Sequence, residues 1–211
     1  MTIRIALVTL LIALVLPSAV AQADNPQLTG IVGTNDAFVI SMRNASGTGI
    51  TQLEPGTYDI TVTDRSEFHN FRLKGPGVDN ATDVEAAQTV TWTVTLTDGR
   101  YVYQCDPHNG QMRGYFLVGN VPPSTAVATV GPKKTIALKP KPTLPGPATI
   151  TVNDRSKTDN FHLTGPGVNK KTGVKTRGNA TWNVTLQPGT YRYRSDKTKK
   201  LRGSFVVRFP S

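Results

Sequence analysis

Four side chains that suit a soft transition metal occur between residues 69 and 112 of this 211-residue chain. Cys105, His108 and Met112 lie on one short segment, and His69 stands upstream in Phe68-His69-Asn70-Phe71. A thiolate, two imidazoles and a weakly bound thioether are the ligand set of a trigonal blue (type 1) copper site. The residues therefore predict one copper ion held by His69, Cys105, His108 and Met112.

Other chemistries compete for the same residues. A lone cysteine is often a small buried hydrophobe, a lone methionine often fills a core, and a reactive thiol or zinc ligation are further alternatives. With one cysteine in the chain, a disulfide framework, a four-cysteine zinc site and a copper centre built on two thiolates are excluded. The chain has no His-x-His or His-Cys-His for a trinuclear copper cluster and no nucleophile–base pair. We therefore expect that it is not an enzyme.

The segments around these residues alternate as β-strands do. Val90, Trp92, Val94 and Leu96 alternate with threonines, and Tyr58–Val62 shows the same period of two. Alternation with one apolar face predicts half-buried strands, and turn signals such as Asp98-Gly99 separate them. Since no helical periodicity is present, the pattern predicts an all-β sandwich.

The chain also repeats itself. When the sequence is shifted by 90 residues, Tyr58–Cys105 aligns with Ala148–Ser195, and 23 of the 48 pairs are identical. Lys139–Pro145 replaces a longer loop, Arg43–Ile50, in the second copy. We predict two domains, 24–120 and 125–211, joined by a Pro-containing linker at 121–124.

The first copy resembles the cupredoxin family, in particular the small plastocyanin- and azurin-like blue copper proteins, through the loop Cys105-x2-His108-x3-Met112 and the upstream His69. The resemblance implies two tandem cupredoxin-like Greek-key β-sandwich domains. It further implies that Asn70 hydrogen-bonds the cysteine sulfur and that His108 serves as the electron port at the surface.

The second copy has lost the four candidate ligands. His69 aligns with Asp159, Cys105 with Ser195, His108 with Thr198 and Met112 with Leu201. Hard oxygen groups do not form a blue copper site. The second domain is therefore expected to be a degenerate cupredoxin scaffold without copper.

The N-terminus has the pattern of an export signal. Arg4 precedes the apolar run Ile5–Leu16, and small residues follow Pro17 up to Ala23. This predicts a signal peptide, residues 1–23, cleaved after Ala21 or Ala23, and a periplasmic or secreted protein. The run is shorter than the roughly 20 residues of a membrane span, so no transmembrane segment is expected after cleavage.

Charge separates the two copies and indicates their partners. Residues 24–120 carry 11 acidic and 6 basic side chains, a net of −5, whereas residues 121–211 carry 3 and 17, a net of +14. We predict a one-electron carrier with an unidentified redox protein partner. The alternative is a copper capture, storage or adhesion protein. The basic copy would dock on an anionic protein, membrane surface or envelope polymer, and nucleic acid is excluded by the predicted export. The docking residues predicted for it are Lys197, Lys199, Lys200 and Arg202.

Overall fold

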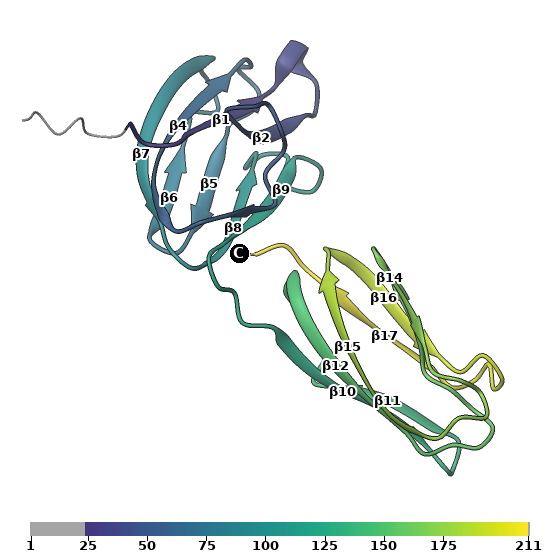
Figure 1. Ribbon diagram of the computed structural model, residues 1–211. Coiled ribbons are helices and arrows are strands. Elements are labelled where there is room, and N and C mark those ends of the chain that lie inside the picture. The colour runs from purple at the N-terminus through teal and green to yellow at the C-terminus, as the bar shows by residue number, and fades with distance from the viewer. Residues whose placement is uncertain (1–23, 211) are drawn as a thin grey trace, which may run out of the picture.

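The computed structural model describes residues 24–210 as two β-sandwiches that follow one another along the chain (Figure 1). The predicted signal peptide lies outside the described residues. Within 24–210, no helix has both the length and the apolar character needed to cross a membrane.

The first sandwich contains two sheets. One has the strand order β2-β1-β4-β7 and the other the order β3-β9-β8-β5-β6. The four strands of the first sheet are β1 (Gln27–Val32), β2 (Ile40–Asn44), β4 (Gly56–Asp64) and β7 (Gln88–Leu96). The five strands of the second are β3 (Gln52–Leu53), β5 (Arg72–Gly75), β6 (Val78–Ala81), β8 (Gly99–Gln104) and β9 (Arg113–Val118).

The second sandwich has corresponding sheets in the orders β11-β10-β12-β15 and β14-β13-β16-β17. Its strands are β10 (Ser124–Gly131), β11 (Thr135–Lys139), β12 (Gly146–Asp154), β13 (His162–Gly165), β14 (Val168–Lys171), β15 (Gly178–Leu186), β16 (Gly189–Arg194) and β17 (Arg202–Val207). The predicted all-β class with two tandem sandwiches is confirmed. The corresponding strand orders are those that a duplication would produce, and the duplication itself stays a prediction, as do the domain limits.

The alternating segments become strands because one face of each enters a core. β4 pairs with β7 in antiparallel register, which places Ile60 opposite Trp92 and Val62 opposite Val90. Ile60 and Val62 are fully buried, and Trp92 packs against the same core at partial exposure. Full burial of such an aliphatic side chain contributes about 1.5–3 kcal/mol, so the hydrophobic face fixes the register of the sheet.

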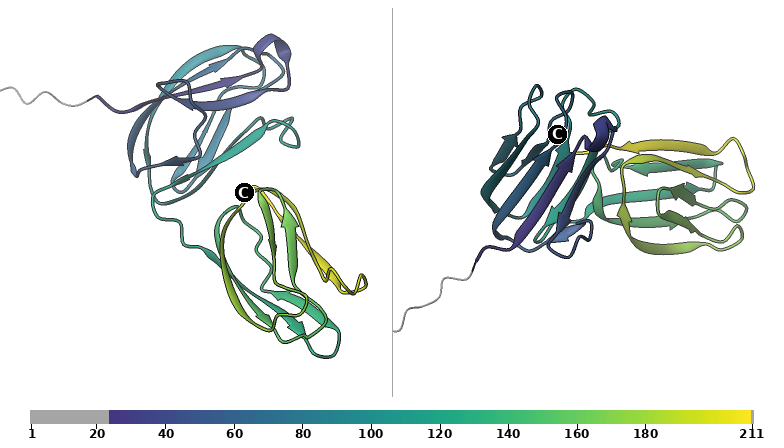
Figure 2. Two further views of the ribbon diagram at one scale, coloured as in Figure 1. Left: turned by 45° about the vertical axis from the view of Figure 1, so that its right-hand side comes forward. Right: turned by 90° about the horizontal axis from the view of Figure 1, so that it is seen from above.

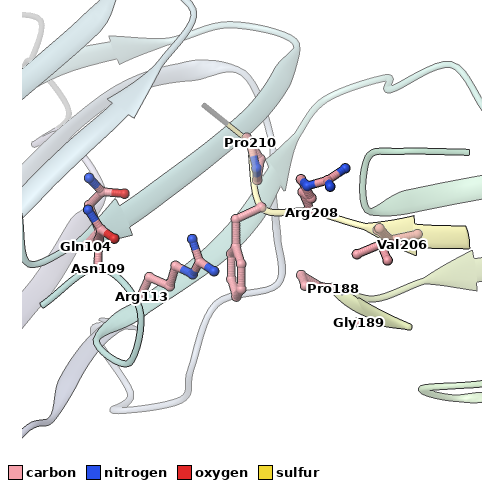
Figure 3. A pocket seen from close by; sticks show the side chains of 10 residues that line it. Gln104, Asn109, Arg113, Pro188, Gly189, Val206, Arg208 and Pro210 are labelled. Atoms are coloured by element: carbon pink, nitrogen blue, oxygen red, sulfur yellow. The ribbon is translucent and has the colours of Figure 1, made fainter. Parts of the chain in front are cut away.

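The two sandwiches touch near their connection at residues 119–123, as the additional views show (Figure 2). The segment after β17 returns to the first sandwich, where the Phe209 ring centroid lies 4.3 Å from the guanidinium carbon of Arg113. Arg100 Nε donates a hydrogen bond of 2.6 Å to the Pro145 carbonyl. A cavity of about 610 Å³ separates Arg113 from Pro188 and Val206 at this junction (Figure 3).

Candidate metal centre

The loop between β4 and β5 carries His69, and a buried carboxylate anchors this loop. Asp64 ends β4, accepts a hydrogen bond of 2.6 Å from Thr82 Oγ1 and accepts another of 3.3 Å from the Ser66 amide. Burial raises the pKa of Asp64, although these hydrogen bonds oppose the shift. The turn after β4 is thereby fixed to the segment after β6, which sets the position of His69.

The other candidate ligands lie on the turn between β8 and β9. The Cys105 amide donates to the Met112 carbonyl at 2.9 Å, and the Met112 amide donates to the His108 carbonyl at 2.9 Å. The His108 amide donates in turn to the Cys105 carbonyl at 3.2 Å. These bonds close the loop on itself and bring its two ends together.

Three donor atoms converge between the two loops. Cys105 Sγ lies 3.7 Å from His69 Nδ1 and 3.5 Å from His108 Nδ1, and the two Nδ1 atoms are 3.0 Å apart. Donors bound at about 2.0–2.3 Å to one transition-metal ion are themselves roughly 3–4 Å apart, so the spacing fits a single shared ion. Within 24–210, this is the one such grouping of His, Cys or acidic side chains. One thiolate and two imidazoles are a donor set suited to copper.

A neighbouring carbonyl orients the first imidazole. His69 is 2% exposed, and its Nε2 lies 3.4 Å from the Asp36 carbonyl oxygen, so Nε2 is placed to carry the proton. With Nε2 protonated, Nδ1 keeps a free lone pair, as a metal-binding imidazole requires. The Asp36 carbonyl therefore favours the His69 tautomer that leaves Nδ1 free to bind a metal.

An aromatic ring covers both imidazoles. The Phe38 centroid lies 5.3 Å from that of His69 and 4.8 Å from that of His108, both in edge-to-face geometry.

Phe38 follows the short 3-10 helix η1 (Thr34–Asp36), which begins after Gly33 at φ +66°. A Cβ at Gly33 would lie 2.5 Å from Ser66 Cβ, so glycine permits this loop to approach the loop of His69. Neither contact was predicted, since both join segments far apart in sequence.

Met112 is placed beside the converging donors. It is 1% exposed and belongs to the same buried cluster as Cys105. Its backbone bonds to Cys105 and His108 keep it at the base of the loop. Ligation by its thioether stays a prediction.

Asn70 is buried next to the site, and its side chain forms hydrogen bonds with Asp106 and Thr82. Its Nδ2 donates to Asp106 Oδ2 at 2.9 Å and to the Thr82 carbonyl at 3.4 Å, while its Oδ1 accepts the Asp106 amide at 2.7 Å. These contacts occupy the side-chain amide of Asn70, and a hydrogen bond from Asn70 to the cysteine sulfur stays a prediction. Asn160 makes the same bonds to Asp196 and Thr172 in the second sandwich. Because these side-chain bonds are also present beside Ser195, where there is no thiolate, their role is to hold the loop in place.

Arg72 adds a second brace to the loop. It contacts Asp79 at 2.7 Å and Asp106 at 3.3 Å. Burial alone would raise the pKa of Asp106, but hydrogen bonds from Asn70, Gln104 and Arg72 outweigh it and lower the pKa. The loop is therefore held by an ionised carboxylate directly after Cys105.

The corresponding end of the second sandwich contains a hydrogen-bonded network. Asp159 Oδ1 accepts a bond of 2.8 Å from Ser195 Oγ, and Ser195 Oγ accepts the amides of Lys197 and Thr198, each at 3.1 Å. Burial alone would raise the pKa of Asp159, but hydrogen bonds from Thr198, Ser195 and Thr158 outweigh it and lower the pKa. Side chains with oxygen atoms thus stand at three of the four candidate ligand positions, and Leu201 stands at the position of Met112.

Replacing Asp159 with asparagine is expected to destabilise the second sandwich by about 1–3 kcal/mol, because an amide NH2 replaces one carboxylate oxygen and cannot accept the hydrogen bond that Thr158 Oγ1 donates to Oδ2. The lowered folded-state pKa contributes stability that is present above the unfolded value near pH 4 and is lost as pH falls through the folded value. The difference between wild type and Asp159→Asn should therefore be largest at neutral pH and shrink in acid. Denaturant unfolding over a pH series measures it, and a difference independent of pH would contradict the role given to the carboxylate.

The predicted docking residues lie together as expected from their spacing. Lys197, Lys199 and Lys200 are exposed on the loop between β16 and β17, and Arg202 is exposed at the start of β17. Figure 1 places this loop at the end of the second sandwich farthest from the first. Docking itself stays a prediction.

Comparisons with known proteins return structural similarity alone. No family model and no curated protein matches the chain. The chain is similar to a copper-containing nitrite reductase from Thermus scotoductus, at 12% identity over 87% of this chain and 61% of that one, with a TM-score of 0.33. It is also similar to the copper nitrite reductase of Nitrosomonas europaea, at 13% identity over 88% and 94% of the two chains, with a TM-score of 0.33. A multicopper oxidase shows 14% identity over 86% and 87%, with a TM-score of 0.30.

These comparisons correct one expectation from the sequence. The prediction that the chain is not an enzyme is contradicted, because the similar structures are those of copper enzymes. Identities of 12–14% with TM-scores of 0.30–0.33 carry no reaction over to this chain.

Proposed function

We propose that this chain is an exported cupredoxin-like protein whose first sandwich binds one copper ion in a type 1 centre and transfers one electron at a time. The observation that carries the proposal is the convergence of Cys105 Sγ with the Nδ1 atoms of His69 and His108, all within 4.8 Å of one another. The thiolate donor excludes the hard cations Mg²⁺ and Ca²⁺, which prefer oxygen ligands.

The copper would supply a one-electron couple, and the residues of the chain would keep its surroundings constant. His69 is oriented by the Asp36 carbonyl, and Cys105 sits at the start of a loop braced by Asn70 and Arg72. Ligands held this firmly change little between the two oxidation states, which favours rapid transfer. Met112 would be the weak axial ligand that tunes the reduction potential.

Electrons would enter and leave at the His108 edge. Cys105 and His69 are buried, whereas His108 is only partly buried and touches Phe38, which is 52% exposed. The shortest way from the donors to solvent therefore passes through His108. A redox protein would dock over this edge, and the second sandwich would assist through Lys197, Lys199, Lys200 and Arg202.

Reversible reduction of the copper-loaded protein tests the carrier role. We expect one electron per copper by voltammetry and rapid reduction by a one-electron donor protein. Tight Cu(I) binding without a reversible couple would instead identify a copper capture or storage protein.

Replacing Met112 with leucine should leave the colour and raise the reduction potential. Removing a weak donor stabilises Cu(I) relative to Cu(II), and each tenfold gain in that preference is worth about 59 mV for a one-electron couple. Voltammetry of the variant beside wild type measures the shift. A colourless Met112→Leu protein, or an unchanged potential, would contradict the axial role of Met112.

A further inference from the structure

The outer face of the sheet β14-β13-β16-β17 collects basic side chains from separate strands. Register places His162 between Lys171 on β14 and Arg194 on β16, and places Arg194 opposite Arg202 on β17. The next row holds Thr164, Arg192 and Ser204. Tyr191 and Tyr193 alternate with these arginines and point into the core, so both arginines of β16 lie on the solvent side.

The arrangement is unfavourable for folding alone. Like charges placed directly opposite on antiparallel strands destabilise the pair, and Arg194 opposite Arg202 is such a pair. In the first sandwich the corresponding pair is Gln104 and Arg113, with one charge. An anion bound between the two guanidinium groups would offset this repulsion, so the pair on an exposed face points to a bound anion.

Little carboxylate is present to offset the arginines. Asp196 contacts Arg194 at 3.4 Å, but the same carboxylate also contacts His162 at 2.7 Å and Asn160 at 3.0 Å. Among residues 24–210, neither Arg192 nor Arg202 forms an ion pair. Their guanidinium groups are therefore available to an external oxyanion.

The same arginines line a hollow. A concavity of about 530 Å³ is bordered by Arg192, Arg194 and Arg202 together with the hydroxyl residues Thr164 and Ser204. This volume is in the range of small-molecule sites, roughly 300–1,000 Å³. Guanidinium groups match phosphate geometry through paired N–H donors, and hydroxyls can add further hydrogen bonds.

We infer that this face of the second sandwich is a binding site for a phosphate-type oxyanion, held chiefly by Arg192 and Arg202. The site lies on the sheet and shares Arg202 with the docking residues predicted from sequence, whose three lysines lie on the adjacent loop. It requires no metal in the first sandwich. A small soluble ligand and a lipid headgroup offer the same phosphate chemistry.

The test compares Arg192→Gln/Arg202→Gln with the matched control Lys133→Gln/Lys175→Gln in the full-length protein. The control removes the same charge from two exposed loops of the second sandwich. Calorimetric titration with inorganic phosphate, at an ionic strength fixed with chloride, should show at least tenfold weaker binding for the arginine variant and unchanged binding for the control. Equal affinity in all three proteins, or no binding by wild type to phosphate or to the vesicles described next, overturns the site.

Two further measurements identify the source of the phosphate group and test the repulsion between Arg194 and Arg202. Cosedimentation with phosphatidylcholine vesicles, with and without phosphatidylglycerol, supports a lipid headgroup if only the arginine variant loses binding to the anionic vesicles. Phosphate binding without vesicle binding supports a soluble ligand. Without phosphate, Arg202→Gln alone should melt no lower than wild type, because a like-charge pair is relieved, and a lower melting temperature contradicts the argument from repulsion. All measurements use metal-free protein, so they stand whether or not the copper proposal holds.

Discussion

Replacing Cys105 with serine abolishes the intense visible absorption expected of the copper-loaded protein. That absorption belongs to charge transfer from a thiolate to copper, and a serine hydroxyl offers neither the soft donor nor the covalency. Cys105 Sγ is the one sulfur within hydrogen-bonding distance of both imidazoles among the described residues. Loss of a residue that only supports a metal ligand typically weakens metal binding by about 10–100-fold. Because Cys105 is itself a candidate ligand, we expect its loss to weaken copper binding by more than this. Absorption spectra and copper titrations of the two proteins measure both effects.

A thiol moved to the second sandwich provides the matched control. The double variant Cys105→Ser/Ser195→Cys keeps one thiol per chain, but Asp159 takes the place of His69 and Thr198 that of His108. This protein should remain colourless. Colour in either variant would show that the metal does not depend on the donors assigned to it.

Removing the Asn70 side chain should weaken copper binding by about 10–100-fold without removing a ligand. Asn70 holds the Asp106 amide and carboxylate, directly after Cys105, and its loss leaves that amide without its partner. Leaving the buried partners of Asn70 without hydrogen bonds should also lower the free energy of unfolding by about 1–3 kcal/mol. Copper titration and denaturant unfolding of Asn70→Ala measure the two effects.

Asn160 offers the comparison that separates stability from metal binding. Its contacts with Asp196 and Thr172 repeat those of Asn70. Asn160→Ala should therefore lose similar stability in its own sandwich and leave copper affinity and colour unchanged. If Asn70→Ala binds copper as tightly as wild type, the brace on the loop does not position the site.

The sequence was sufficient to predict which ligand types come together. The spacing Cys105-x2-His108-x3-Met112 is local, and a closed turn between two strands brings its ends together whatever the rest of the fold does. His69 was included because its imidazole completes the ligand set, and the structure places its Nδ1 3.0 Å from that of His108. The alternation of β4 and β7 likewise predicted which side chains of each strand enter the core.

Contacts between distant loops were not predictable in the same way. Phe38 reaches both imidazoles because Gly33, Asn35 and Asp36 take left-handed backbone conformations. Glycine, asparagine and aspartate adopt such angles more readily than other residues, but which distant loop the turn contacts depends on tertiary packing. The hydrogen bonds between the Asn70 side chain and Asp106 were not predicted for a related reason, since they join two loops far apart in sequence.

The arginine face carried a signal that sequence reasoning did not use. Tyr191-Arg192-Tyr193-Arg194 alternates with a period of two, which places both arginines on one face of a strand. Pairing of Arg194 with Arg202 needs the register across the intervening loop, and that register appears only in the folded sheet. Lys197, Lys199 and Lys200 were predicted as docking residues because they lie close together in the sequence.

Titration of the metal-free full-length protein with Cu(II), followed by visible absorption and electron paramagnetic resonance, shows whether Cys105, His69 and His108 form one copper centre. We expect saturation at one copper per chain, with intense blue colour and the narrow copper hyperfine splitting of a thiolate-bound centre. Stoichiometric binding that gives only a weak, pale band with broad hyperfine splitting would contradict a centre built on Cys105, His69 and His108.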